Sequence, residues 1–389
     1  MTQIASVAIL IFWANVGLLA YIYWAYGAIL RILVRLIRGR DHKFGFHDGA
    51  WPAVTALLTV HNEECQIEGR LINISEQIYP GEIEILVCSD GSDDRTDELA
   101  SKFHGPHSVR LLQTARLGKS GAQNIAMREA KGEIVVLTDA ETRFDAKCIY
   151  EMVSAFAEET VGCITANLRF RNYAGAIAKN QGFYWKYELA LRDLESRLGI
   201  LAVASGQAMA FRRKLFRELP PFAGDDCIIP LDVVDQGYKV IHCPSAVAHD
   251  NTQRKAVREL RSRIRMTARS WTGMWLYPTL LNPISKPGYA LALWSHKLLR
   301  WLASSCLIWL PCGALAMFVT STQTLTAYFF ATFAAIAGIG WWADRNEKSI
   351  PIAGTVYSFC LANLGFLLGV IRAILGHRIT SYRLDGGLR

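Results

Sequence analysis

The chain has 389 residues, a net charge of +8, only 20% charged residues and a mean hydropathy of +0.18. This composition is too apolar for an ordinary soluble enzyme, and the length allows one large domain or two moderate ones. Nine cysteines form no Cys-x-x-Cys pair, which argues against a zinc or disulfide framework and favours a reducing compartment. The positive charge lies mainly beside apolar segments, so we expect anionic lipid headgroups as its partner, phosphate-bearing substrates second, and no nucleic acid.

The first apolar segment predicts a membrane anchor over residues 1–36. Residues 4–30 contain no charged side chain, which is long enough to span a bilayer. Basic residues follow this run directly: Arg31, Arg35, Arg38, Arg40 and Lys43. A signal peptide has its basic residues before the apolar run, so we expect an anchor that is not cleaved. The positive-inside rule then places the following residues in the cytoplasm, at the inner (cell) membrane.

Residues 50–257 predict the catalytic body. We expect strands at 53–60, 83–88, 109–112 and 133–138, with helices between them at 63–77, 93–103 and 121–130. This β-α-β-α-β-α-β alternation is typical of an α/β fold with a doubly wound, mainly parallel sheet. Beyond residue 145 we expect a helix near 145–159, strands near 161–170 and 207–211, and an amphipathic stretch at 174–197. This second half is expected to build the acceptor side of a cleft.

The last third of the chain is expected to return to the membrane. Residues 258–296 combine a basic helix with a stretch rich in Trp, Tyr and Pro, which predicts interfacial amphipathic helices. Residues 297–376 contain three apolar runs, near 301–320, 325–342 and 352–371, and predict a multi-pass protein. One anchor and three spans would put the tail 377–389 outside, whereas its basic residues favour the inside. The number of spans and the side of the C-terminus therefore stay open.

Two apolar strands end in carboxylates, at Asp90 and at Asp139. Ligands of parallel α/β sheets bind beyond the carboxyl ends of the strands. Alternate residues of an extended segment point the same way, so Asp139 and Glu141 can face one hard cation, Mg²⁺ or Mn²⁺. Gly91 permits a sharp turn beside a ligand, and the start of the next helix favours anions. The pair of strand ends predicts a site for a divalent cation and a nucleotide-linked substrate.

Four further motifs accompany these strand ends. They are His61-Asn62-Glu63-Glu64, Gly118-Lys119-Ser120-Gly121, Ser205-Gly206-Gln207 and Gly224-Asp225-Asp226. In this order, the motifs resemble those of membrane-integrated family 2 glycosyltransferases of the GT-A fold, which are related to polysaccharide synthases. The resemblance covers residues 53 to about 270, and the flanking apolar segments match that architecture. It implies a hexosyl- or N-acetylhexosaminyltransferase of glycan or polysaccharide biosynthesis.

The resemblance implies a binding site for a nucleotide diphosphate sugar, which we expect to be UDP-linked. His61 would stack on the base in place of the usual aromatic residue, with Glu63 beside it. Asp90 would contact the base or ribose. Asp139 would contact the nucleotide and share the metal with Glu141, which replaces the second Asp of the family's Asp-x-Asp. Lys119 either neutralises the diphosphate or is a solvated lysine at a helix start, and its loop lacks the upstream Gly of a Walker loop.

On the acceptor side, the resemblance makes Asp226 the base that deprotonates the acceptor hydroxyl. Asp225 is the neighbour most easily confused with it, and Gly206 lies in the turn that lines the acceptor pocket. We expect inverting transfer to a lipid-linked sugar or another membrane-associated acceptor. His249 is open to two interpretations, as a third metal ligand or as a structural histidine.

The main departure from the family lies further on. Processive relatives carry Gln-x-x-Arg-Trp, and the corresponding residues here are Ser262 to Met266, which keep only the Arg, at position 265. Arg265 either binds the diphosphate or belongs to a basic, membrane-facing surface. A processive polysaccharide synthase remains the alternative enzyme, and a membrane scaffold that retains the fold remains the non-catalytic alternative. The sequence identifies neither the sugar, nor the acceptor, nor the oligomeric state.

Overall fold

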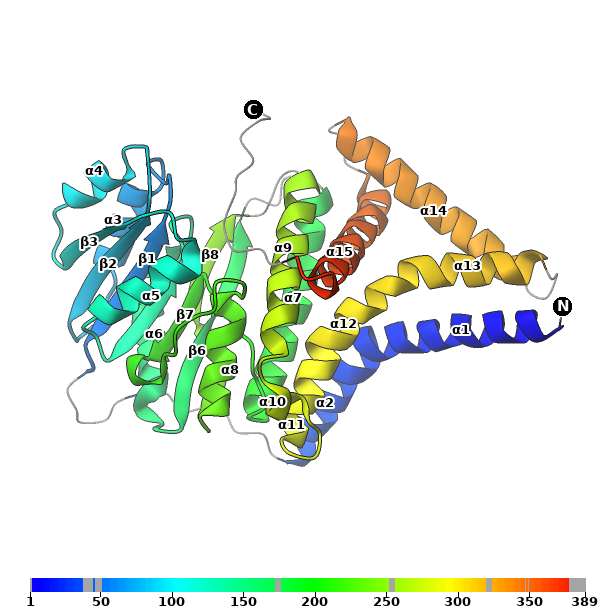
Figure 1. Cartoon of the computed structure of the whole chain (residues 1–389), viewed down its shortest axis with the longest axis horizontal. Helices are drawn as coiled ribbons and strands as arrows, with labels where there is room; N and C mark the ends of the chain where they lie inside the picture. The colour runs from blue at the N-terminus through cyan, green and yellow to red at the C-terminus, as the bar shows by residue number, and fades with distance from the viewer. Residues whose placement is uncertain are drawn as a thin grey trace.

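The computed structural model describes residues 2–37, 45, 51–171, 176–251, 256–319, 324–346, 348 and 350–377. An α/β domain lies on one side of the molecule and a group of long helices on the other (Figure 1). Several basic residues used above lie outside the described residues: Arg38, Arg40, Lys43 and the tail from 378 onward.

One eight-stranded sheet forms the frame of the α/β domain, in the order β3-β2-β1-β4-β7-β6-β8-β5. The strands are β1 Val54–Val60, β2 Ile83–Asp90, β3 Ser108–Thr114, β4 Ile134–Thr138, β5 Arg143–Phe144, β6 Val161–Arg171, β7 Ala208–Arg212 and β8 Lys239–Asn251. Strands β3, β2, β1 and β4 are mutually parallel, β7 runs antiparallel to β4 and β6, and β5 runs antiparallel to β8. The doubly wound, mainly parallel sheet expected from the sequence is confirmed.

Helices cover both faces of this sheet and bury two apolar clusters. The helices are α3 Ile67–Ser75, α4 Thr96–Ser101, α5 Lys119–Glu129, α6 Cys148–Ser154 and α8 Asp225–Asp235, with short η2 Ala155–Ala157 and η3 Arg213–Leu215. Successive side chains of a strand point to opposite faces. Leu58 of β1 therefore packs with Leu71 of α3, whereas Leu57 packs in the cluster that contains Ala126 of α5 and Ile228 of α8.

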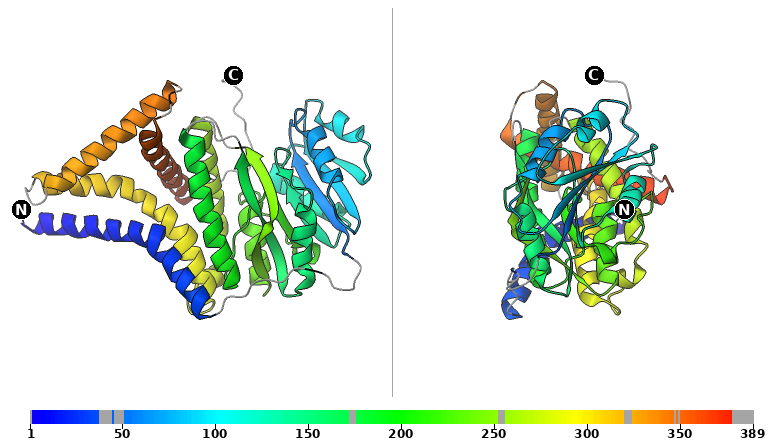
Figure 2. Two further views of the ribbon diagram at one scale, coloured as in Figure 1. Left: turned by 180° about the vertical axis from the view of Figure 1, so that it is seen from behind. Right: turned by 90° about the vertical axis from the view of Figure 1, so that its left-hand side faces the viewer.

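Two long helices, α7 Ala176–Arg197 and α9 Ala256–Met274, stand between the sheet and the apolar helices (Figure 2). The N-terminal helix runs through α1 Thr2–Ala20, η1 Tyr21–Ala25 and α2 Tyr26–Leu36. The C-terminal helices are α10 Pro278–Leu281, α11 Pro287–Ala292, η4 Leu293–Leu298, α12 Leu299–Leu302, η5 Ala303–Ser305, α13 Cys306–Val319, α14 Thr324–Arg345 and α15 Pro351–Ile374.

Among the described residues, three helices are long and apolar enough to cross a membrane: Ile9–Leu36, Pro287–Ala316 and Pro351–Ile374. The second of them starts inside the stretch that the sequence predicts to be interfacial. Pro287 occupies the first turn of a helix, where its missing N–H costs nothing. The apolar run expected near 325–342 forms α14.

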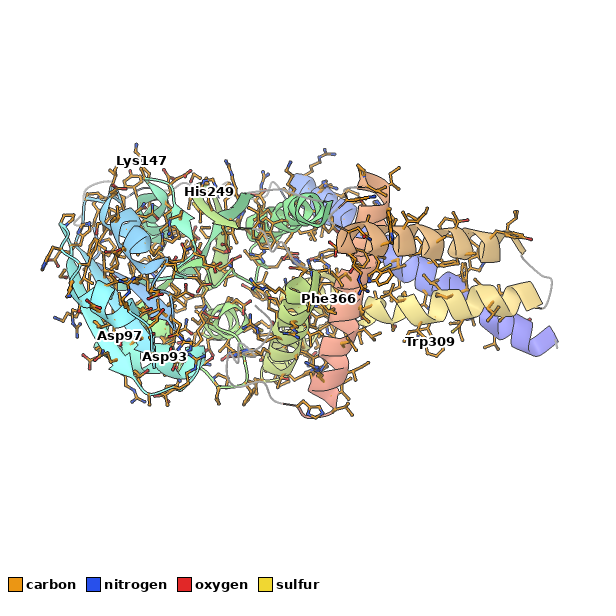
Figure 3. All side chains as sticks on the ribbon, turned by 90° about the horizontal axis from the view of Figure 1, so that it is seen from above. Asp93, Asp97, Lys147, His249, Trp309 and Phe366 are labelled. Carbon is orange, nitrogen blue, oxygen red and sulfur yellow. The ribbon has the colours of Figure 1, made fainter. Side chains whose placement is uncertain are left out.

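Helix α15 packs closely along α9 through two glycines on one face (Figure 3). A Cβ added at Gly365 would lie 2.8 Å from Arg263 Cβ, and one at Gly369 would lie 2.6 Å from Thr267 Cβ. Phe366, between them, has the Arg263 guanidinium 5.5 Å from its ring centre. Small residues at this spacing allow two helix backbones to approach closely.

Replacing Gly369 by Ala is expected to push α15 away from α9. The new methyl group would also lie 2.9 Å from the Ile264 carbonyl oxygen, which is backbone and cannot rotate away. Overpacking of this kind destabilises by about 1–3 kcal/mol, so we expect a lower Tm for the detergent-solubilised protein. Gly338 of α14 has no neighbouring atom within 4 Å of an added Cβ, so Gly338→Ala is the matched control. Equal Tm values for the two variants would contradict close packing at Gly369.

Candidate active site

The carboxyl ends of β1, β2 and β4 meet at one edge of the sheet. Val60 pairs with Ser89 across β1 and β2, and Leu58 pairs with Thr138 across β1 and β4. The residues that follow are therefore neighbours, and His61 Nδ1 lies 3.0 Å from the Asp90 carbonyl oxygen. The structure thus brings together the first motif and the two acidic strand ends, as the sequence indicates.

The loop after β1 is held to the loop after β2. Asn62 has a φ of +56°, which is uncommon for a residue other than glycine. Its side chain donates to Asp93 Oδ1 at 2.5 Å and accepts from the Asp93 N–H at 2.9 Å. The Glu63 N–H donates to Thr96 Oγ1 at 2.7 Å. These contacts fix the direction in which His61 and Glu63 leave the sheet.

Asp90 supports the turn that carries Lys119. Its carboxylate is 5% exposed and accepts hydrogen bonds from the Leu117 N–H at 2.6 Å and the Gly118 N–H at 3.0 Å. Gly118 has a φ of +80°, a conformation that glycine adopts without strain. The sequence did not indicate this use of Asp90, and a contact between Asp90 and the base or ribose stays a prediction.

Lys119, the first residue of α5, joins the two sides of the expected cleft. Its Nζ lies 2.9 Å from Asp139 Oδ1 and 3.2 Å from Asp225 Oδ2. Although burial opposes its charge, these two carboxylates raise the pKa of Lys119. Gln123, one turn further along α5, donates to Asp225 at 2.8 Å. Lys119 is therefore a charged member of this cluster, and its role toward the diphosphate stays a prediction.

Carboxylates crowd the end of β4. Burial, followed by the charges of Glu141, Asp139 and Asp94, raises the pKa of Glu63 to about 7. Such a concentration of carboxylate oxygens suits a hard divalent cation. Within the described residues, no group of three or more His, Cys, Asp or Glu side chains forms a ready-made metal centre. Asp139 and Glu141 stay the predicted metal ligands.

His249 has a protein partner outside this cluster. It pairs with Arg143 at the edge formed by β5 and β8, and its Nε2 lies 2.9 Å from Asp145 Oδ1. Figure 3 shows His249 near Lys147 and well separated from Asp93. The structural interpretation of His249 therefore accounts for its contacts without a metal.

Helix α8 begins with the two candidate bases, and their environments differ. Asp225 is buried, and despite that burial the Lys119 charge and the Gln123 hydrogen bond lower its pKa. Asp226 is half-buried, and burial together with the Asp225 charge raises its pKa. Two adjacent carboxyl groups whose pKa values are pushed apart take different roles. The raised pKa of Asp226 supports the predicted role of this residue as the base, which stays a prediction.

A proline in α8 leaves the Asp226 carbonyl oxygen available for a hydrogen bond to the neighbouring loop. Pro230 lies inside α8, four residues after Asp226, and has no N–H to bond the Asp226 carbonyl oxygen. The Ala204 N–H donates to that oxygen instead, at 3.4 Å. Gly206, two residues on, packs directly on the other acid, because a Cβ added there would lie 3.1 Å from Asp225 Oδ2. The loop at Gly206 and the two carboxylates thus form one unit.

Replacing Gly206 by Ala is expected to lower kcat/KM about tenfold, because a misplacement near the chemistry is costly even when it is small. The Asp225 carboxylate cannot give way freely, since Lys119 and Gln123 hold it. The Tm of the variant should stay close to that of the parent protein. Steady-state kinetics and thermal unfolding on the same preparation test this, and unchanged kinetics would show that Asp225 has room to move.

Sequence reasoning missed Arg269, which the structure places at the junction of two loops. Its Nη2 donates to Ser120 Oγ at 2.9 Å and to the Ala223 carbonyl oxygen. Burial lowers the pKa of Arg269, while the charges of Asp225 and Asp226 oppose that shift. Arg265, the predicted residue, lies one turn earlier on α9 and adds to the lowering. The i, i+4 spacing of Arg265 and Arg269 was the sequence feature that could have indicated Arg269, because residues four apart lie on the same face of a helix.

Residues 55–220 match the family model described as glycosyl transferase family 2. These residues form a family 2 glycosyltransferase domain. An N-acetylglucosaminyltransferase of Sinorhizobium fredii is 25% identical over 62% of this chain and 61% of its own length. A poly-beta-1,6-N-acetyl-D-glucosamine synthase of Staphylococcus aureus is 27% identical over 58% of this chain and 57% of its own length. The chain therefore spans about three fifths of the length of these two relatives.

A solved structure shares the fold of the glycosyltransferase domain and of the helices around it. It is a mannosyltransferase from Pyrobaculum calidifontis in complex with GDP-Man and Mn²⁺, with a TM-score of 0.72 and 22% identity. The match covers 96% of this chain and 99% of that one. It confirms the GT-A fold expected from the sequence.

Proposed function

We propose that the protein is a metal-dependent, inverting glycosyltransferase. It moves a sugar from a nucleotide diphosphate sugar to a lipid-linked or membrane-associated acceptor in glycan or polysaccharide biosynthesis. The observation that carries the proposal is the Lys119 bridge between Asp139 and Asp225, beside Asp226. This bridge supports the proposal because it joins a candidate metal ligand to a candidate partner of the diphosphate, next to a candidate base.

Different side chains would carry out the separate tasks of a direct displacement of the diphosphate by the acceptor hydroxyl. Asp226 takes the proton of the acceptor hydroxyl as its oxygen attacks the anomeric carbon and the bond to the diphosphate breaks. Lys119 and Arg269 lie where positive charge can offset the negative charge of the departing diphosphate. Asp139 and Glu141 would hold a Mg²⁺ or Mn²⁺ ion, which would supply Lewis acidity toward the same group. A single displacement requires no covalent intermediate and inverts the anomeric carbon.

The names of the relatives guide the choice of donor. Both are associated by name with N-acetylglucosamine, whereas the similar solved structure holds GDP-Man. UDP-N-acetylglucosamine is therefore our first candidate donor. The test incubates purified protein with a panel of nucleotide sugars, membrane-lipid acceptors and Mn²⁺, and analyses the products by mass spectrometry. Addition of one sugar supports the proposal, and donor binding without any turnover favours the scaffold.

Processive synthesis is the second candidate function, because one relative is named a polysaccharide synthase. Residues 262–266 lack the Gln and the Trp of the Gln-x-x-Arg-Trp motif that processive relatives carry, which argues against it. Product length decides between the two, because a ladder of long polymer on a gel excludes single transfer.

We further propose that the protein spans the cell membrane with its catalytic domain in the cytoplasm, as the basic residues after the first apolar helix suggest. Cys65, next to the loop after β1, is exposed in the structure. A membrane-impermeant maleimide is expected to label Cys65 only after intact cells are permeabilised. A Cys65→Ser variant identifies the labelled residue, and labelling of Cys65 in intact cells would reverse the orientation.

A further inference from the structure

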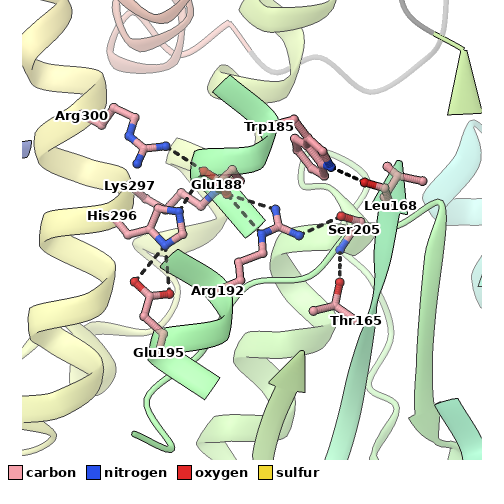
Figure 4. A network of polar contacts seen from close by, with 10 residues as sticks. All are labelled: Thr165, Leu168, Trp185, Glu188, Arg192, Glu195, Ser205, His296, Lys297 and Arg300. Atoms are coloured by element: carbon pink, nitrogen blue, oxygen red, sulfur yellow. Dashed lines mark hydrogen bonds and ion pairs between the residues drawn. The ribbon is translucent and has the colours of Figure 1, made fainter. Parts of the chain in front are cut away.

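A buried group of charges joins α7 to the apolar helix that begins at Pro287 (Figure 4). Glu188 of α7 accepts from Arg192 Nη2 at 3.1 Å, Lys297 Nζ at 3.0 Å and Arg300 Nη1 at 2.8 Å. His296 contacts both Glu188 and Glu195. The Glu188 carboxylate thus pairs with three side chains that carry a full positive charge. The Lys297 side chain is 20% exposed, whereas those of Glu188 and Arg300 are 2% exposed.

This charged group is connected to the loop of the candidate active site. Arg192 donates to Ser205 Oγ at 2.8 Å, and the Ser205 N–H donates to Thr165 Oγ1 at 3.1 Å. Ser205 precedes Gly206, which packs on Asp225. A continuous line of contacts therefore runs from Lys297 through Glu188 and Arg192 to the loop beside the two acids.

Lys297 is also an electrostatic neighbour of the candidate base. The principal charged groups that act on Asp226 are Asp225 of its own helix, Lys119 of α5, Arg269 of α9 and Lys297 of η4. Burial and Asp225 raise the pKa of Asp226, and the three cations lower it. Lys297 is the cation among them that comes from a candidate membrane span.

The local helix geometry is unusual where Lys297 projects. Residues Leu293–Leu298 form a π-helical segment, and Tyr21–Ala25 of the N-terminal helix form another. The two segments are tied by Tyr21 and Ser295, whose hydroxyl oxygens lie 2.8 Å apart. Short π-helical turns inside α-helices occur frequently at functional sites because they redirect side chains.

We propose that Lys297 is a positioning residue of the transfer site. The helix that begins at Pro287 delivers an ammonium group that binds Glu188, and through Glu188 and Arg192 it holds the loop at Gly206, which packs on Asp225. This proposal rests on the proposed function. It makes a candidate membrane span part of the transfer site, so that the catalytic domain alone is incomplete.

The test compares the pH dependence of kcat/KM for the acceptor in the parent protein and in Lys297→Met. A positive charge near a carboxylate lowers the pKa of that carboxylate, so removal of the Lys297 charge should shift the acid limb of the profile to higher pH. Lys297→Arg keeps the charge and should retain the parental limb. Glu63 also titrates near neutral pH, so the difference between variants is the measured quantity.

Arg300→Met is the matched control, because it removes another cation that binds Glu188, whereas the principal charges on Asp226 are those of Asp225, Lys119, Arg269 and Lys297. The Arg300→Met variant should have a lower Tm, but the acid limb of its pH profile should stay at the parental pH. Lys297→Met should fold, since Arg192 and Arg300 still bind Glu188. Three outcomes would overturn the Lys297 proposal alone. They are an acid limb at the parental pH in Lys297→Met, an equal shift of that limb in Arg300→Met, and a shifted limb in Lys297→Arg. Absence of sugar transfer by the parent protein would overturn the proposed function and this proposal together.

Discussion

Asp226→Asn is expected to lower kcat by about 10²- to 10⁴-fold, the usual contribution of a general base. The amide keeps the shape of the side chain but cannot take a proton from the acceptor hydroxyl. Binding of the nucleotide diphosphate should change little, because Asp226 makes no contact with Lys119 in the structure, whereas Asp225 does. Steady-state kinetics and calorimetric titration with UDP provide the two measurements.

Two variants of the same helix complete this experiment. Asp235→Asn removes the carboxylate at the other end of α8, which pairs with Arg217 on the surface, and should leave kcat unchanged. Asp225→Asn removes the partner of Lys119 and Gln123 and should weaken donor binding as well. If Asp225→Asn lost turnover while Asp226→Asn kept it, the base would be Asp225.

Asp139→Asn is expected to reduce kcat/KM at least about 100-fold and to raise the Mn²⁺ concentration required for half-maximal activity. A neutral amide oxygen is a weaker ligand for a hard cation than a carboxylate oxygen. Treatment of the parent protein with a chelator should abolish transfer, and added Mn²⁺ or Mg²⁺ should restore it. Activity is measured across a metal titration at saturating donor.

Two further variants separate ligand loss from loss of the ion pair with Lys119. Lys119→Met breaks the same 2.9 Å contact and should weaken donor binding, but the metal requirement should stay near the parental value. Asp145→Asn releases His249 and should leave the metal requirement unchanged. An unaltered metal titration in Asp139→Asn would place the cation elsewhere, and an altered one in Asp145→Asn would bring His249 back as a ligand.

The positions of the two acidic strand ends could be predicted from the sequence, because they depend on the local pattern of apolar residues and on a general rule of parallel sheets. Asp90 and Asp139 follow continuous apolar runs, and strands of one parallel layer end at the same edge. The order of the motifs was enough to place Lys119 and Gly206 near them. No distance could be foreseen, so the bridge from Lys119 to Asp139 and Asp225 emerged only in the structure.

The elements that sequence reasoning missed depend on long-range contacts. Helix α8 contains Pro230, which argues against a helix locally, yet most of its residues are buried under the sheet. Strand β8 includes Pro244 and pairs with β6, its distant neighbour in sequence. Arg269 reaches Ser120 only because α9 lies where α15 and the sheet place it. Tertiary packing overrides local propensity in each case.

The close contact between α9 and α15 has a consequence for how the protein responds to its surroundings. α15 is a candidate membrane span, and α9 carries Arg269 into the cluster of Lys119, Asp225 and Asp226. A change in bilayer thickness that tilts α15 would move α9 with it, since Gly365 and Gly369 leave no slack between the two backbones. Turnover compared across vesicles of different acyl-chain length, at constant donor and acceptor concentration, is then expected to vary, and an equal rate in all vesicles would contradict this coupling.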